Sequence, residues 1–117
     1  MDFKFPRQLK LANADDFKKV FANPNRTGDA LLVLLYCENN LTHPRLGLAV
    51  SKKHIRTAVK RNKVKRVIRE FFRTEQSTKK GLDIVVLSRP GLASAHNSQI
   101  RFSLRKLWTR LDKKCVD

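Results

Sequence analysis

The stretch Arg45–Arg73 reads RLGLAVSKKHIRTAVKRNKVKRVIREFFR and changes its periodicity part of the way along. Residues 45–50 alternate large with small side chains, which is typical of a strand whose two faces differ in bulk. Small residues also permit the close approach of another backbone, so we expect another backbone segment to lie against Gly47 and Ala49. From residue 57 to residue 73, apolar residues recur at helical spacing, at positions 64, 67, 68 and 71. The stretch therefore predicts a strand followed by an amphipathic helix.

The predicted helix carries basic side chains opposite its apolar stripe. Residues 52–73 hold ten basic residues and a single acid, Glu70. The row opposite the stripe consists of Asn62, Arg66, Arg69 and Arg73. Like charges at this spacing destabilise a helix, whereas each guanidinium group can hold a phosphate with two hydrogen bonds. The row therefore favours a phosphate-binding surface over a merely solvated helix face, although it does not distinguish DNA from RNA.

The whole chain is small and strongly basic. It has 117 residues, a formal net charge of +16 and 41% hydrophobic residues, which is enough for one domain spanning residues 1–117. Repulsion among so many positive charges destabilises a small protein and is best tolerated when the partner is a polyanion. Nucleic acid is therefore the first candidate partner, and an anionic membrane surface is the second. No apolar run is long enough for a membrane span, and the first residues lack the pattern of a signal peptide. We expect a cytoplasmic protein without membrane attachment.

The segments on either side complete the expected fold. Asn13 is placed to cap a short helix that ends at Asn23-Pro24, and residues 94–98 offer caps for a C-terminal helix through residue 111. Residues 30–37 and 83–87 are short apolar runs typical of buried strands, and the seven-residue link after the first allows an antiparallel hairpin with residues 45–50. The order α-β-β-α-β-α predicts an α+β fold, in which helices cover a small mixed β-sheet that includes a βαβ crossover.

Three aromatic residues form a second candidate site. Phe17 and Phe21 share a face of the first predicted helix, and Tyr36 lies on the first long strand. Composition alone favours core packing for all three. Aromatic rings that border a cleft near Lys52 and Lys53 would instead stack single-stranded bases.

The sequence offers little for catalysis by protein side chains. The ten acids are scattered, the three histidines lack a metal-ligand spacing, and no Gly-rich phosphate loop is present. The two cysteines, Cys37 and Cys115, have no partners at zinc-ligand spacing. We therefore expect no catalytic residue and no metal or cofactor bound by the protein side chains.

Several strings together carry a resemblance to a known family. RLGLAVSKK at residues 45–53 is followed by AVKRNKVKRVIRE at residues 58–70. Phe5-Pro6-Arg7 precedes them, and Asp83-Ile84-Val85-Val86 with Arg89-Pro90-Gly91 follows, in the same order as in the family. Over nearly its whole length, the chain resembles the protein subunit of bacterial ribonuclease P.

The resemblance implies a noncatalytic subunit that binds a catalytic RNA and the 5′ leader of precursor tRNA, with no obligatory protein partner. The RNA, with bound Mg²⁺, would hydrolyse the phosphodiester. The residues that match the face toward the catalytic RNA are Arg61, Asn62, Lys63, Lys65, Arg66 and Arg69, and the basic row adds Arg73. The residues that match the leader cleft are Phe17, Phe21, Ser51, Lys52 and Lys53, with Tyr36 as a further candidate. The resemblance also implies that the βαβ crossover is left-handed.

The chain departs from the family pattern at two positions. Lys63 stands where the family usually has arginine, so the bidentate hydrogen-bonded contact that a guanidinium group makes with phosphate is not available there. The strand aromatic of the family usually lies two residues before Tyr36, where this chain has Leu34.

Three other functions are compatible with parts of the sequence. A structural RNA-binding protein of the ribosome fits the composition equally well, and binding of a precursor tRNA leader would separate it from a ribonuclease P subunit. A self-sufficient nuclease is disfavoured because acids and histidines are not clustered. A membrane-surface helix at the C-terminus is the weakest alternative, because Trp108 and its leucine neighbours are needed for the core.

The basic row predicts a strong salt dependence of RNA binding. If it and its neighbours neutralise about six or more phosphates, affinity falls about 10³-fold between roughly 50 and 200 mM salt. A filter-binding titration over this range checks the slope. A nearly flat dependence would remove the electrostatic argument.

Overall fold

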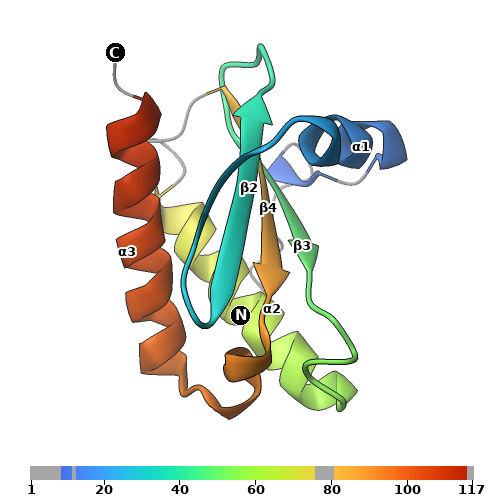
Figure 1. Ribbon diagram of the computed structural model, residues 1–117, viewed down its shortest axis with the longest axis vertical. Coiled ribbons are helices and arrows are strands. Elements are labelled where there is room, and N and C mark those ends of the chain that lie inside the picture. The colour runs from blue at the N-terminus through green and yellow to red at the C-terminus, as the bar shows by residue number, and fades with distance from the viewer. Residues whose placement is uncertain (1–8, 12, 76–80, 116–117) are drawn as a thin grey trace.

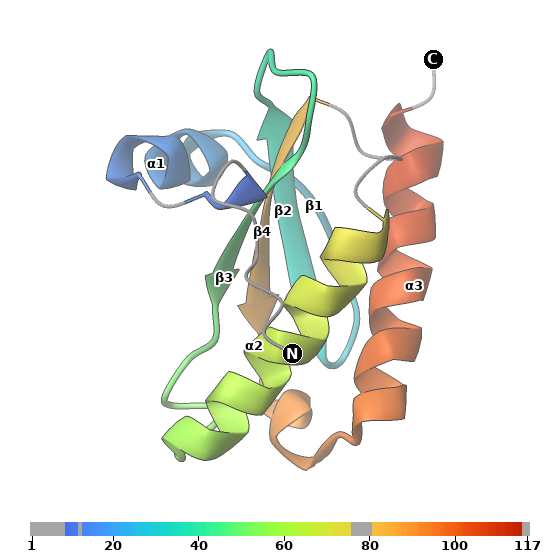
Figure 2. The same cartoon turned by 180° about the vertical axis from the view of Figure 1, so that it is seen from behind.

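The computed structural model describes residues 9–11, 13–75 and 81–115 as a four-stranded mixed sheet with helices on both faces (Figure 1). In chain order the elements are α1 (Ala14–Ala22), β1 (Asn25–Gly28), β2 (Leu32–Glu38), β3 (Arg45–Ala49), α2 (Ala58–Glu75), β4 (Leu82–Ser88), the 3₁₀ helix η3 (Pro90–Ser94) and α3 (Asn97–Cys115). Helices α2 and α3 cover one face of the sheet, and α1 lies against the other (Figures 1 and 2). The predicted α+β class is confirmed.

The strand order in the sheet is β1-β2-β4-β3. The predicted hairpin between β2 and β3 is wrong, because β4 lies between them, antiparallel to β2 and parallel to β3. Residues 39–44 link β2 to β3, and six extended residues reach about 20 Å, enough to cross two strand spacings of about 4.8 Å. Strand β4 takes the central place because it is apolar on both faces, with Ile84, Val85 and Val86 at most 1% exposed.

Strand β3, helix α2 and strand β4 form the βαβ crossover. In Figure 1 both strands run downward with β3 to the right of β4, and α2 lies behind the sheet, as Figure 2 shows from the other side. This arrangement makes the crossover left-handed, as the family resemblance implied. Since about 98% of such connections are right-handed, general rules of chain topology would have given the opposite hand.

Strand β1 is absent from the predicted order of elements. Asn25 and Gly28 are residue types typical of turns, so the local sequence does not favour a strand. The segment is nevertheless antiparallel to β2, from the pair Asn25–Tyr36 to the pair Gly28–Val33. Pairing with the free edge of β2 therefore outweighs the weak local preference.

The predicted apolar stripe of α2 is the inner face of the helix. Its buried residues are Val64, Val67, Ile68, Phe71 and Phe72. Trp108 of α3 meets both phenylalanine rings edge to face, with ring centroids 5.6 Å apart in each pair. Because the stripe is buried, the opposite basic row of α2 is directed away from the sheet.

One cluster of charged groups joins β3, β4 and α1. Arg45 donates from Nε and Nη2 to the two carboxylate oxygens of Asp83, at 2.8 Å each, and from Nη1 to Asp16 of α1 at 3.0 Å. Asn39 donates to the same Asp83 carboxylate at 2.9 Å. Asp83 is 2% exposed, and its hydrogen bonds raise the pKa of Arg45 above its ordinary value. The cluster ties the first residue of β3 to β4 and holds α1 beside them.

A second carboxylate, Asp29, ties the turn between β1 and β2 to α3. It accepts hydrogen bonds from the backbone N–H groups of Leu31 and Leu32 and from the Ser103 hydroxyl, and its carboxylate lies 3.1 Å from Lys106 Nζ. Burial alone would raise the pKa of Asp29, but these hydrogen bonds outweigh it and lower the pKa from 3.8 to about 2.

The buried stripe predicts that Phe71→Ala lowers the free energy of unfolding by roughly 3 to 5 kcal/mol, because it leaves a cavity beside Trp108. The matched control is Phe102→Ala on α3, where the side chain is 71% exposed and little packing is lost. Urea denaturation measures both variants. Equal losses in the two would show that the inner face of α2 is assigned incorrectly.

The lowered pKa of Asp29 predicts a pH-dependent contribution to stability. The folded state holds the ionised form, so its contribution of about 1 to 2 kcal/mol is complete above the unfolded pKa. It is lost as the pH falls from 3.8 toward about 2. Asp29→Asn should therefore flatten the dependence of the unfolding free energy on pH in this window. If the unfolding free energies of the two proteins fall equally with pH in this window, the stabilising role assigned to ionised Asp29 is wrong.

Candidate nucleic-acid interface

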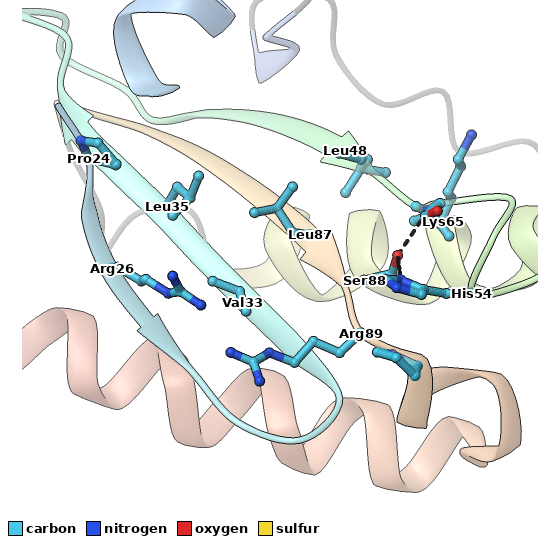
Figure 3. Close-up of a pocket in the computed structure, with 14 residues that line it drawn as sticks. Pro24, Arg26, Val33, Leu35, Leu48, His54, Lys65, Leu87, Ser88 and Arg89 are labelled. Atoms are coloured by element: carbon cyan, nitrogen blue, oxygen red, sulfur yellow. Dashed lines mark hydrogen bonds between the residues drawn. The ribbon is translucent and has the colours of Figure 1, made fainter. Parts of the chain in front are cut away.

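The face of the sheet that carries α1 is only partly covered and contains a groove of about 830 Å³ (Figure 3). Val33 and Leu35 of β2 and Leu87 of β4 form its apolar floor. These side chains lie on the sheet face opposite the one that packs on α2 and α3. The groove thus lies beside a basic helix and above apolar side chains, of which Val33 and Leu35 are almost fully buried and Leu87 is half-buried.

Basic side chains from three separate elements border this groove. Arg26 comes from β1, Arg89 follows β4, and Lys65 comes from α2. Figure 3 shows the guanidinium groups of Arg26 and Arg89 on the two sides of Val33. No described carboxylate lies within ion-pair distance of Arg89 or Lys65. An apolar floor with a cationic border suits a strand of nucleotides, whose bases are apolar on their faces and whose phosphates are anionic.

Hydrogen bonds shape the end of the groove that adjoins β3. The Ser88 hydroxyl accepts a hydrogen bond from Ser51 N–H at 2.9 Å and lies 3.0 Å from His54 Nδ1 (Figure 3). Ser51 and His54 line the groove as a result. Lys52 and Lys53 occupy the turn between them and are exposed, but they do not line the groove itself.

A second pocket, of about 220 Å³, lies beside Phe17 at the β3 edge of the sheet. Lys65 and Arg69 of α2 line it, and so does Lys10, whose segment runs beside β3 through the hydrogen bond from Leu11 N–H to Leu46 C=O at 2.8 Å. Lys65 also borders the large groove, so the two spaces are neighbours. The structure therefore brings the predicted cleft aromatic Phe17 together with two residues that the sequence assigned to the catalytic-RNA face.

Phe17 owes its position to a glycine. A Cβ atom built on Gly47 would lie 2.7 Å from two atoms of the Phe17 ring, so no other residue fits there without displacing the ring. The predicted close approach to this strand face is thus made by an aromatic side chain and by Leu11, not by another backbone. The neighbouring Phe21 ring is stacked on Phe17, with centroids 6.5 Å apart, and is 48% exposed.

Tyr36 does not belong to this cleft. It is 2% exposed and packs among the residues beneath α2 and α3, on the same face as Leu34. Phe17 packs on the other face, against a cluster that contains Val33 and Leu35. The placement of Tyr36 in the leader cleft is therefore wrong, because side chains two apart in a strand share a face and Leu34 faces the core.

The outer face of α2 is exposed and basic. The exposed members of the predicted set are Asn62, Lys63, Arg66 and Arg69. None of the three basic residues among them is paired with a described acid, and the nearby Glu70 is exposed as well. Their mutual repulsion is therefore not relieved within the described part of the chain.

The three other members of the predicted set, Arg61, Lys65 and Arg73, are half-buried. Arg61 donates from Nη1 to the carbonyls of Ile55 and Arg56, at 2.9 Å each, and so holds the loop that precedes α2. Arg73 lies in the last turn of the helix. Arg61 consequently has a structural task besides any contact with RNA.

Sequence reasoning did not assign Arg26, Arg89 and His54 to any site, although all three line the groove. Arg26 lies on the strand that the sequence did not predict. Arg89 and His54 follow strand ends that come together only in the sheet. The family motif around Arg89 was the one available signal.

Two further findings concern metal sites and membrane-spanning helices. The described residues contain no group of three or more His, Cys, Asp or Glu side chains arranged to hold a metal ion. None of the described helices is long and apolar enough to cross a membrane.

Comparison with protein families gives one match that spans most of the chain. Residues 5–112 match the family model described as Ribonuclease P. The ribonuclease P protein component of Nitrosococcus oceani is 42% identical over 115 residues, which are 98% of this chain and 97% of the relative. That of Aliivibrio fischeri is 43% identical over 113 residues, or 97% of each chain.

Solved structures show the same similarity in three dimensions. The ribonuclease P protein of Staphylococcus aureus superposes with a TM-score of 0.82 at 32% identity, over 88% of this chain and 94% of that one. The ribonuclease P protein of Thermotoga maritima superposes with a TM-score of 0.77 at 32% identity, over 86% and 96% of the two chains.

Proposed function

The chain belongs to the family of ribonuclease P protein components, and on that premise we propose that its groove binds the 5′ leader of precursor tRNA while α2 binds the catalytic RNA. The family is the accessory subunit of an endoribonuclease, and its role is the processing of tRNA 5′ ends. The proposal concerns which surface of this chain meets which RNA.

The observation that carries the proposal is the groove of about 830 Å³ on the open sheet face. Its apolar floor accepts base faces, and Arg26, Lys65 and Arg89 on its border attract the phosphates. The stacked pair Phe17–Phe21 extends this surface with a partly exposed aromatic platform. Stacking and backbone charge together bind a single strand with little dependence on its sequence, which suits leaders that differ between precursors.

The outer face of α2 suits a different ligand. Its exposed Lys63, Arg66 and Arg69 lie on a rigid helix and offer no aromatic ring for stacking. Such a row contacts phosphates of a folded RNA without reading its bases. This face supports the binding of the catalytic RNA, with Asn62 as a neutral hydrogen-bonding member.

Lys65 and Arg69 lie where these two surfaces meet. Both line the pocket beside Phe17, and both belong to the basic helix. We therefore assign Lys65 to the leader groove and Arg69 to the boundary between the two RNAs. Lys52 and Lys53 would contact phosphates of a strand as it enters the groove past Ser51.

The chemical step belongs to the RNA in this proposal. Mg²⁺ bound by the catalytic RNA would activate the attacking water, and the protein would hold the leader next to that centre. A cytoplasmic location, where precursor tRNA is processed in bacteria, is part of the same proposal.

The decisive experiment compares Phe17→Leu with Arg66→Ala in the reconstituted complex. Phe17→Leu keeps an apolar side chain but removes the flat ring, so the binding of precursor tRNA with a long leader should weaken by about 1 to 3 kcal/mol. Binding of mature tRNA and assembly with the catalytic RNA should hardly change. Arg66→Ala should impair assembly with the catalytic RNA, whatever the leader length.

The control for Arg66→Ala is Glu70→Gln on the same exposed helix face, which removes the single acid there and should leave RNA binding unchanged or slightly stronger. Thermal unfolding checks that all variants are folded. Equal losses of Phe17→Leu on long and trimmed leaders would show that Phe17 only packs against Gly47.

A further inference from the structure

Phe102 of α3 is the most exposed large apolar side chain in the described part of the chain, at 71%. A pocket of about 420 Å³ lies beside it, between α3 and the turn that joins β1 to β2. Its other lining residues are Asp29, Ala30, Leu31, Ser98, Gln99, Ser103 and Lys106. Its volume is in the range of small-ligand pockets, and its lining combines apolar surface with hydrogen-bonding groups.

Two basic side chains lie near Phe102, and one of them is paired with a carboxylate. Lys106 Nζ lies 5.9 Å from the centroid of the ring, and Arg101 next to Phe102 is exposed. Residues 97–111 of α3 contain no acid. The one carboxylate in the pocket, Asp29, is ionised, as its lowered pKa shows, and forms an ion pair with Lys106, so the exposed Arg101 is the cation beside the ring that no described carboxylate neutralises. An exposed aromatic ring with an adjacent unneutralised cation attracts a nucleotide, because the base stacks on the ring and the cation attracts the phosphate.

This pocket adjoins the end of the large groove. Arg89, which borders the groove, donates its backbone N–H to the carbonyl of Leu31 at 3.0 Å. Gly91, two residues after Arg89, lies so close to the same turn that a Cβ atom built on it would be 2.9 Å from the Ala30 carbonyl oxygen. Ala30 and Leu31 line the Phe102 pocket from the other side. A strand that leaves the groove past Arg89 and Pro90 therefore has only this turn to cross.

We propose that Phe102 is a second stacking platform, which binds an unpaired base of the distal part of the leader after the strand has left the groove. The inference rests on the proposed leader groove. Ser98 and the side-chain NH₂ of Gln99, whose oxygen accepts a hydrogen bond from His96 N–H, offer hydrogen bonds to the edge of the stacked base. Arg101 lies next to Phe102, where it attracts the phosphate of the same nucleotide. The protein would thereby bind long leaders more tightly than leaders that end within the groove.

A nucleotide fits this surface better than a protein partner does. The patch has a single exposed ring among basic residues, whereas the core of a protein interface is depleted of charge and needs a larger apolar area. The chain is also +16 overall, which favours an anionic ligand here as elsewhere.

The experiment measures the affinity of the reconstituted complex for three precursors, whose leader is absent, ends within the groove, or extends several nucleotides beyond it. Phe102→Leu removes the ring, Phe102→Trp keeps a stacking surface, and Leu41→Ala is the matched loss of an exposed apolar side chain elsewhere. A 2-aminopurine base in the distal leader reports stacking through quenching of its fluorescence.

We expect Phe102→Leu to weaken binding of the extended leader about tenfold and to abolish the quenching, because one stacked base is lost. Binding of the short leader and of the catalytic RNA alone should not change. Phe102→Trp and Leu41→Ala should behave as the unaltered protein does.

Three results would overturn the inference. In the first, Phe102→Leu binds the extended leader as tightly as the unaltered protein does. In the second, Phe102→Leu loses the same affinity for short and extended leaders. In the third, Phe102→Leu loses affinity for the catalytic RNA alone, which would assign the platform to that RNA. If the unaltered complex binds the precursor with a short leader more tightly than the precursor without a leader, the proposed leader groove is supported, whatever the Phe102 variants show. If it binds all three precursors equally, the proposed groove fails and this inference fails with it.

Discussion

The ion pair between Arg45 and Asp83 is the contact on which the remaining arrangement depends. The two residues are register partners in the parallel pair β3–β4, and the two parallel hydrogen bonds leave little freedom in how these strands align. The third bond, to Asp16, holds α1 over the same end of the sheet. Asp83 is buried, so loss of the guanidinium would leave an uncompensated charge there. Strand register and the position of α1 are thus set together.

The position of α1 decides what the open face of the sheet can bind. With α1 held at the end near Asp83, Phe17 reaches Gly47, and a groove remains on the rest of this face, lined by Val33, Leu35 and Leu87. The opposite face is fully used by α2 and α3, whose apolar stripes form the main core. The sheet therefore separates the main core on one face from a groove with an apolar floor on the other.

The left-handed crossover places the basic helix beside that groove. Helix α2 packs on the far face of the sheet, yet its Lys65 and Arg69 reach the β3 edge and the pocket that contains Phe17. The two surfaces that we propose for RNA binding consequently share a border instead of lying on opposite sides of the molecule. This proximity suits the proposed role, in which the subunit holds a substrate strand close to a catalytic RNA.

The sequence by itself determined the elements that have a strong period or a clear cap, and the charge they carry. The Asn13 cap, the stripe of α2, the buried strands β2 and β4 and the basic row opposite the stripe follow from spacing that depends on local geometry alone. Only the tertiary structure decided the insertion of β4 between β2 and β3, the pairing of β1, the burial of Tyr36 and the assembly of Arg26, His54 and Arg89 around one groove. These features arise from contacts between residues far apart in the chain, and a local pattern carries no information about which strand edge or sheet face a distant segment will meet.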